Sequence, residues 1–383
     1  MLIHLIAAAR PNFMKIAPLF HALKKEDWAT PIIVHTGQHY DLNMSDAFFE
    51  DLRLPEPDLH LDVGSGTHAE QTGQIMIAYE KVLLENKPDL VIVVGDVNST
   101  VACALATSKI QYLDSTQNSG LRPQNLQRRR PLLAHLEAGL RSFDRTMPEE
   151  INRLLTDALA DTLWTPSRDA DQNLMREGVS PKKIHRVGNI MIDSLEILRD
   201  KIQNQAAYND FGLKPGDYGV ITLHRPSNVD DQGVLKQICH TLMRIAQKIP
   251  LIFPIHPRTR KNLKRNGLMP LVDKASGLHL SQPLNYIRFM NLIFNCRLAI
   301  TDSGGIQEET TYLGIPCLTM RPNTERPVTI RQGTNQLCNP ENLEAKVERI
   351  LSGEITHGAI PELWDGKTAT RMVKSIKLIA PSS

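Results

Sequence analysis

The amino-acid sequence predicts an α/β protein made of two Rossmann-like halves, each built around a parallel sheet. Strand-length apolar runs alternate with segments of helical periodicity, and the same alternation starts again after about residue 190. Because these runs are apolar throughout, they indicate strands buried on both faces, as in parallel sheets covered by helices. The length of 383 residues is that of two domains.

The first half shows strands and helices in alternation. Segment 68–87 has the clearest helical pattern, because Ile75, Ile77, Val82 and Leu83 lie on or near one face. Segment 89–96 is an all-apolar run that ends in Gly-Asp. The predicted strands of this half are 2–9, 31–37, 89–96 and 131–139, and its predicted helices are 15–25, 68–87 and 100–109.

One segment interrupts this alternation. Residues 111–130 are polar and lack a consistent period, whereas connections in such folds usually have about 2–6 residues. We therefore expect 111–130 to be an exposed loop. Its basic run, Arg128, Arg129 and Arg130, is typical of a solvated charged face, with contact to phosphate or to a partner as the alternative.

The second half repeats the pattern. Its predicted strands are 218–225, 250–257, 298–305 and 316–322, and its predicted helices are 233–248 and 285–294. Segment 179–193 is the best junction, so we predict one domain at 1–186 and a second at 187–365. The last residues, 366–383, contain helical spacing and are expected to pack back on the first domain.

Composition excludes several classes of function. A formal net charge of +2 argues against a dedicated nucleic-acid binder. The five cysteines form no CxxC pair, which indicates reduced thiols in a cytoplasmic protein. The apolar N-terminus is expected to be a first strand, not a signal peptide, and no run approaches the ~18 apolar residues of a membrane span. Histidines lack metal-ligand spacing and no GxGxxG follows the first strand, so neither a metal nor a nicotinamide cofactor is expected.

Charged side chains follow the predicted strands of the first half, at the edge where ligands collect in open α/β sheets. Arg10 and Lys15 come after the first strand, Asp96 and Glu137 after two later ones, and Glu149 near the next helix. Asp96 as a helix cap and Glu149 as an ordinary first-turn acid are the alternative interpretations. Glu137 lies in an apolar context, where an isolated acid is costly unless paired, and this favours function.

The second half carries a different chemistry. His224 follows one strand, and DSGGIQEE (302–309) follows another, so that Ser303, Gly304 and Gly305 precede a predicted helix. A helix that begins in such a turn offers backbone N–H groups and its positive dipole end to an anion, and Arg326 could add a cation. A plain strand–turn–helix is the alternative. The two halves together suggest a nucleotide held by the second and acid–base chemistry performed by the first, across a cleft.

The same segments resemble a known family. ARPNFMKIAPL, TGQHYD, VVGDVNST, HLEAGLRSFDRTMPEEINR, VGNIMID, LHRPSNVD, PIHPRT and DSGGIQEETTYLGIPCLTMRPNTERP are similar, in this order, to motifs of the non-hydrolysing UDP-N-acetylglucosamine 2-epimerases. The resemblance extends to about residue 340. It implies a GT-B arrangement with an interdomain cleft, usually in a homodimer, and a role in polysaccharide biosynthesis.

The resemblance also implies a reaction, the interconversion of UDP-GlcNAc and UDP-ManNAc. Because the C2 proton of the sugar is not acidic, the family is thought to eliminate UDP, which gives 2-acetamidoglucal. UDP is then re-added after C2 has been reprotonated on the other face. Such chemistry needs acids and bases near C2 and a firm hold on the leaving diphosphate. It needs no cofactor.

Individual residues match the family's motifs. Asp96, Glu137 and Glu149 match three catalytic carboxylates, and His224 matches an active-site histidine, with the acid and base roles left open. The implied substrate-binding residues are the basic pair Arg10 and Lys15, the diphosphate turn Ser303, Gly304 and Gly305, the ribose acid Glu309, the nucleotide contact Arg326, and Leu284 and Phe289 at the uracil.

The chain also departs from the family. Ala8 and Ala9 replace the usual Gly-Thr before Arg10, and 111–130 exceeds the family spacing by roughly twenty residues. Gln38 and His39 fit the start of a regulatory UDP-GlcNAc pocket, after which the sequence diverges. A C2 epimerase of another UDP-sugar, such as a 2,3-diacetamido uronate, is the main alternative, and a GT-B glycosyltransferase is a second.

Overall fold

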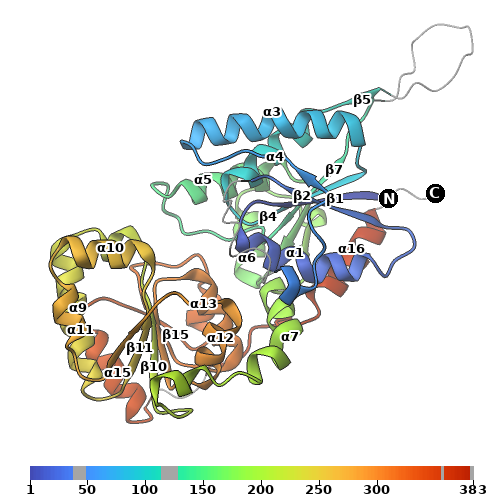
Figure 1. Cartoon of the computed structure of the whole chain (residues 1–383). Helices are drawn as coiled ribbons and strands as arrows, with labels where there is room; N and C mark the ends of the chain where they lie inside the picture. The colour runs from blue at the N-terminus through green and yellow to red at the C-terminus, as the bar shows by residue number, and fades with distance from the viewer. Residues whose placement is uncertain (38–48, 114–127, 355–357, 380–383) are drawn as a thin grey trace, which may run out of the picture. The chain divides into compact units, whose positions relative to one another are not determined.

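The computed structural model describes residues 1–37, 49–113, 128–354 and 358–379 (Figure 1). The chain forms two compact units. The first comprises Met1–Ile197 together with Glu362–Ser383, and the second comprises Leu198–Pro361. Each unit is an α/β structure around a parallel sheet, so the predicted fold class of two parallel-sheet α/β domains is confirmed.

The sheet of the first unit has the strand order β3-β2-β1-β4-β7-β8-β9, and neighbouring strands are parallel throughout. Its strands are β1 (Leu2–Ala7), β2 (Thr30–His35), β3 (Leu59–His60), β4 (Leu90–Val94), β7 (Leu132–Leu136), β8 (Thr162–Thr165) and β9 (Ile184–Arg186). The chain reverses its direction of travel across the sheet between β1 and β4. In a doubly wound sheet this topological switch point opens a crevice at the carboxyl ends of the strands, where ligands bind.

Helices separate these strands and supply the apolar cover that parallel sheets need. They are α1 (Arg10–Leu23), α3 (His68–Asn86), α4 (Asn98–Lys109), α5 (Pro148–Leu159), α6 (Arg168–Arg176), the 3₁₀ turn η1 (Pro181–Lys183), and α7 (Ile190–Gln203), which runs across the unit boundary. All five residues of β4 are buried. Helix α3 packs on α4 and turns Ile75, Tyr79 and Leu83 into the core.

The C-terminal helix α16 (Thr368–Ile379) belongs to the first unit and packs against α1. Asp193 accepts hydrogen bonds from the first backbone N–H groups of α16, those of Thr368 (3.0 Å) and Ala369 (2.8 Å). Trp364 Nε1 donates to the carbonyl oxygen of Pro166 at 2.9 Å. These bonds tie the end of the chain to elements that lie 175 to 198 residues earlier.

The expectation of an exposed loop at 111–130 is wrong about the loop at both ends of that segment, whereas Gln111, Arg129 and Arg130 are exposed as expected. Strands β5 (Tyr112–Leu113) and β6 (Arg128–Arg129) pair as a short antiparallel ribbon, and Tyr112 is buried. Arg129 forms an ion pair with Asp89, and Arg130 holds Asp161 with two hydrogen bonds of 2.6 and 2.7 Å. Arg129 and Arg130 therefore anchor the ribbon to the sheet. Residues 114–127 lie outside the described residues.

The second unit repeats the winding with the strand order β12-β11-β10-β13-β14-β15, again all parallel. Its strands are β10 (Gly219–Thr222), β11 (Leu251–Pro254), β12 (Leu278–Ser281), β13 (Leu298–Thr301), β14 (Cys317–Met320) and β15 (Asn335–Cys338). The switch point lies between β10 and β13, which carry His224 and the Ser303 turn just beyond their ends.

Helices again separate the strands of this unit. They are η2 (Ala207–Phe211), α8 (Pro226–Val229), α9 (Gln232–Ala246), α10 (Pro257–Arg265), α11 (Met269–Asp273), α12 (Tyr286–Asn295), α13 (Gly304–Leu313), α14 (Val328–Arg331) and α15 (Leu343–Leu351). Within the described parts of both units, a search for a helix long and apolar enough to cross a membrane finds none.

Candidate active site

In the first unit, the ends of β4 and β7 meet the start of α1. Lys15, on the first turns of α1, forms an ion pair with Glu137, directly after β7, and both side chains are largely buried. Gly95 follows β4 with a φ of +67°, and a Cβ atom there would lie 3.4 Å from Lys15 Nζ and 3.6 Å from Glu137 Oε2. The positive φ favours glycine, whereas the added Cβ would make only ordinary van der Waals contacts. Glu137 itself has a φ of +74°, an unusual conformation for a non-glycine residue.

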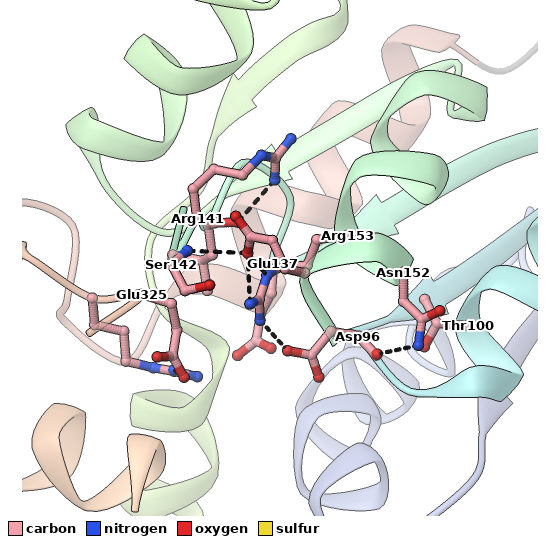
Figure 2. A network of polar contacts seen from close by, with 12 residues as sticks. Asp96, Thr100, Glu137, Arg141, Ser142, Asn152, Arg153 and Glu325 are labelled. Carbon is pink, nitrogen blue, oxygen red and sulfur yellow. Dashed lines mark hydrogen bonds and ion pairs between the residues drawn. The ribbon is translucent and has the colours of Figure 1, made fainter. Parts of the chain in front are cut away.

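Asp96 is the next residue along this turn, and α5 holds it from the other side (Figure 2). Arg153 forms an ion pair with the Asp96 carboxylate. Asn152 Nδ2 donates to the Asp96 carbonyl oxygen at 2.9 Å. Asp96 is thus a fixed, partly exposed carboxylate next to the Lys15–Glu137 pair. The alternative interpretation of Asp96 as an ordinary helix cap has no support, since α4 begins after Val97 without a side-chain cap.

The two glutamates at the start of α5 have different environments. Glu149 is exposed. Glu150 is buried and accepts hydrogen bonds from the backbone N–H groups of Ser142 (3.0 Å) and Phe143 (2.9 Å), and it pairs with Arg153 at 2.7 Å. Burial acts to raise the pKa of Glu150, but these hydrogen bonds and the Arg153 charge outweigh it and lower the pKa. Glu150 therefore fixes the loop that follows Glu137, which has a second strained residue in Phe143 (φ +59°).

Sequence reasoning missed Glu150 and Arg153 as parts of the site. Their spacing of three residues on a helix is a weak signal for an ion pair. The contact between Arg153 and Asp96, 57 residues apart, carries no local signal. Helix α1 begins at Arg10, whose side chain lies outside the described structure, as do Gln38 and His39. Asn12 ties the turn before α1 to β4, because its Nδ2 donates to the Val94 carbonyl oxygen at 3.1 Å.

In the second unit, a buried aspartate orients His224. Asp302 is fully buried, and its Oδ1 lies 2.8 Å from His224 Nδ1. Its Oδ2 accepts from the backbone N–H groups of His224 and Arg225, each at 2.9 Å. Burial acts to raise the pKa of Asp302, but the His224 contact and the backbone bonds lower it. An ionised Asp302 places a proton on Nδ1 and leaves Nε2 of the partly exposed His224 for a ligand.

The glycine turn brings an arginine to the start of α13. Ser303 precedes the helix, and the first turn of a helix offers N–H groups to an anion. A Cβ atom at Gly304 would lie only 2.7 Å from Arg326 Nη1, whereas one at Gly305 would meet nothing within 4 Å. A side chain at Gly304 would therefore displace the end of the Arg326 side chain. Arg326 pairs with Glu308 at 2.9 Å and with Glu325 at 2.6 Å, so two carboxylates already balance its charge.

Glu309 lies one turn further into α13 and is buried. Burial raises its pKa to about 7, the hydrogen bond from Tyr286 acts against this, and the charge of Glu308 adds to it. The Tyr286 hydroxyl donates to Glu309 Oε1 at 2.6 Å and so brings α12 to the acid. Leu284 and Phe289, both half-buried, lie just before and on the first turn of α12. The predicted ribose and uracil residues therefore belong to adjoining elements.

The structure thus gathers the predicted residues into one group in each unit. Lys15 and Glu137 pair beside the Gly95–Asp96 turn in the first unit, with Glu149 on the helix that holds Asp96. In the second, His224 and the Ser303 turn directly follow β10 and β13, Arg326 lies against Gly304, and Tyr286 joins α12 to Glu309. Among the described residues, no three His, Cys, Asp or Glu side chains are arranged to hold a metal ion. Carboxylates beside a lysine are groups that can take and return protons, and a helix start beside an arginine can bind a diphosphate.

Comparison with known proteins identifies the family. A family model described as UDP-N-acetylglucosamine 2-epimerase matches residues 21–131 and 127–377. A UDP-N-acetylglucosamine 2-epimerase of Methanocaldococcus jannaschii is 43% identical over 361 residues, which cover 92% of this chain and 93% of the relative. The chain belongs to the UDP-N-acetylglucosamine 2-epimerase family. Its class is therefore that of an isomerase, as predicted.

Other members of the epimerase family extend the comparison. The crystal structure of the M. jannaschii UDP-GlcNAc 2-epimerase in complex with UDP-GlcNAc and UDP has a TM-score of 0.84 and 40% identity, covering 99% of this chain and 100% of that one. The predicted GT-B-like fold is thereby confirmed. A UDP-2,3-diacetamido-2,3-dideoxy-D-glucuronate 2-epimerase of Pseudomonas aeruginosa is 40% identical over 336 residues, 87% of this chain and 86% of the relative.

Proposed function

We propose that this epimerase interconverts UDP-GlcNAc and UDP-ManNAc by eliminating and re-adding UDP. The proposal rests on one observation: Lys15, Glu137 and the Gly95–Asp96 turn meet at the switch point of the first sheet, in a chain of this family. Removing a proton from C2 alone would be too slow at neutral pH. Departure of UDP from C1 makes it feasible, because the electrons of the C2–H bond then form the C1–C2 double bond of 2-acetamidoglucal.

The proposal assigns the proton transfers to carboxylates of the first unit. One of Asp96, Glu137 and Glu149 takes the C2 proton as the C1–O bond breaks, and another delivers a proton to the opposite face of C2. A phosphate oxygen of UDP then attacks C1. Lys15, paired with Glu137, supplies positive charge where the carboxylate alone would repel the diphosphate. Arg10 is assigned the same role, because it matches the other member of the family's basic pair.

The nucleotide is assigned to the second unit. The N–H groups at Ser303, Gly304 and Gly305 bind the diphosphate, and His224 and Arg326 add donors. His224 is held by Asp302, so its Nε2 can donate to the leaving phosphate oxygen when protonated. Glu309 accepts from the ribose hydroxyls, and Leu284 and Phe289 contact the uracil.

Nuclear magnetic resonance in heavy water tests the proposal. Purified protein given UDP-GlcNAc, without added NAD or metal, is expected to form UDP-ManNAc that carries deuterium at C2. Product without deuterium would exclude proton exchange at C2 and hence the elimination route. Glu137→Gln should lower kcat by at least about 10²-fold with little change in the Kd of UDP, because it removes a proton carrier but no nucleotide contact.

A second candidate substrate is supported by the P. aeruginosa relative, which is named for a 2,3-diacetamido uronate. The same resonance assay with the UDP-2,3-diacetamido uronate decides between the two sugars by the ratio of their kcat/KM values. A homodimer in the cytoplasm, serving polysaccharide biosynthesis, belongs to the same proposal. Light scattering of the purified protein tests the dimer, with twice the mass of one 43.0 kDa chain as the expected result.

A further inference from the structure

His135 is a buried histidine that none of the proposed steps uses. It lies on β7, two residues before Glu137, and is completely inaccessible. Its Nε2 lies 2.8 Å from the carbonyl oxygen of Gly95, and its Nδ1 lies 2.6 Å from Asp157 Oδ1. A carbonyl oxygen only accepts hydrogen bonds, so Nε2 is the donor in the first contact.

The contact to Gly95 acts on Asp96. The Gly95 carbonyl belongs to the peptide plane from which Asp96 begins, so a donor on this oxygen fixes the orientation of that plane. The N–H group of Gly95 is held as well, by the carbonyl oxygen of Leu136 at 3.0 Å. At its other end Asp96 is held by Asn152 and Arg153. Rotation of the Gly95–Asp96 peptide would need the loss of the His135 bond.

Asp157 holds the histidine and also contacts the turn that follows β7. It is a buried residue of α5, and its Oδ2 accepts from the Gly139 N–H group at 3.0 Å, two residues after Glu137. Arg141 pairs with the same oxygen at 2.7 Å. Burial acts to raise the pKa of Asp157, but His135 and Arg141 lower it, which keeps the carboxylate an acceptor. One buried pair thus connects the turns that carry both carboxylates.

We propose that His135 is a positioning residue for Asp96, which holds the Gly95–Asp96 peptide through its Nε2 donor while Asp157 fixes the imidazole ring. The position of the donor matters, because misplacing a reacting group by about 1 Å can cost about 10²-fold in rate. The kinetic part of this inference rests on the proposed function.

Two substitutions separate positioning from packing. In His135→Gln the amide nitrogen replaces Nε2 and can still donate to Gly95, but the contact with Asp157 is lost. In His135→Asn the amide nitrogen replaces Nδ1 and can still donate to Asp157, but the Gly95 oxygen loses its donor. Both remove the ring from the same buried place, so each serves as the packing control for the other.

Kinetics with UDP-GlcNAc provide the first readout. We expect kcat of His135→Asn to fall about 10–100-fold with KM changed by less than about threefold, and kcat of His135→Gln to stay within about fivefold of the wild type. Equal losses in the two variants, a change in KM instead of kcat, or full activity of His135→Asn would overturn the inference. If His135→Asn does not fold, a fall of more than about tenfold in the kcat of His135→Gln would overturn the inference.

Hydrogen exchange provides a readout that does not depend on activity. The amide hydrogen of Gly95, bonded to Leu136, should exchange at least about tenfold faster in His135→Asn and at the wild-type rate in His135→Gln. Unchanged exchange in His135→Asn would overturn the inference. If the wild type does not epimerise UDP-GlcNAc, the proposed function fails while this comparison still decides the role of His135.

Discussion

Raising the pH from 6 to 8 is expected to strengthen UDP binding through Glu309. This side chain is buried in α13, and burial raises its pKa to about 7, against the hydrogen bond from Tyr286 and with the charge of Glu308. One oxygen already accepts from Tyr286, so two ribose hydroxyls can donate to the group only when both oxygens are unprotonated. Below pH 7 the acid is mostly neutral, and UDP must compete with a proton.

The magnitude follows from the raised pKa. If only the carboxylate form binds UDP, the apparent Kd is the intrinsic Kd divided by the ionised fraction, which is about one eleventh at pH 6 and about nine tenths at pH 8. The affinity should therefore increase about tenfold across this range. The free energy of unfolding depends on pH in the opposite direction, because a carboxyl group whose pKa is raised by folding stabilises the folded state at low pH. This contribution is lost as the pH rises from the ordinary value of 4.5 through about 7.

Isothermal titration calorimetry between pH 6 and 8 measures this effect. Phosphate groups also titrate with a pKa near about 6, so Glu309→Gln provides the control for the ligand's own protonation. Uridine, which has no phosphate, provides a second control on the wild type. An affinity of the wild type that does not change with pH, or a pH dependence that persists unchanged in Glu309→Gln, would refute the reasoning.

Two further predictions concern the backbone and the orientation of the site. Asp302→Asn should lower kcat at least about 10²-fold in steady-state assays, because the amide cannot fix the His224 tautomer, and normal kcat would contradict the dyad. Gly139→Ala should lower the free energy of unfolding by about 2–5 kcal/mol in urea titrations, because φ is +80° and the new Cβ would lie 2.5 Å from the Ala170 oxygen. Gly178→Ala, with φ of +85° and open space, is the matched control; equal losses would show that the clash with Ala170 contributes nothing.

Much of the fold and part of the site could be predicted without coordinates. The run 89–96 predicts a buried strand followed by Gly95 and Asp96, and the structure has β4 at Leu90–Val94. Parallel strands end at one edge of a sheet, so polar residues placed directly after them are expected to gather there. Lys15, Asp96 and Glu137 do so. The ribbon of β5 and β6 was missed because strands of two residues each are too short to show a period of alternation.

The choice of partners could not be predicted in this way. Glu149 and Glu150 are chemically identical neighbours, and successive residues of a helix differ by about 100° in direction, so only the packing of α5 decides which one is buried. Arg153 and His135 reach their partners Asp96 and Gly95 across 57 and 40 residues. Contacts at such separations leave no periodic trace in a single sequence.

The side chains that stand at the ends of the strands could be read without coordinates, because apolar runs and the polar residues that follow them are local properties of the chain. The family could be read in the same way. The partners that hold these groups are known from the folded chain alone: Asp302 holds His224, two glutamates hold Arg326, and His135 holds the turn of Asp96. The reason is physical, because a buried polar group must find its partner wherever the packing of the helices and strands brings one within hydrogen-bonding distance.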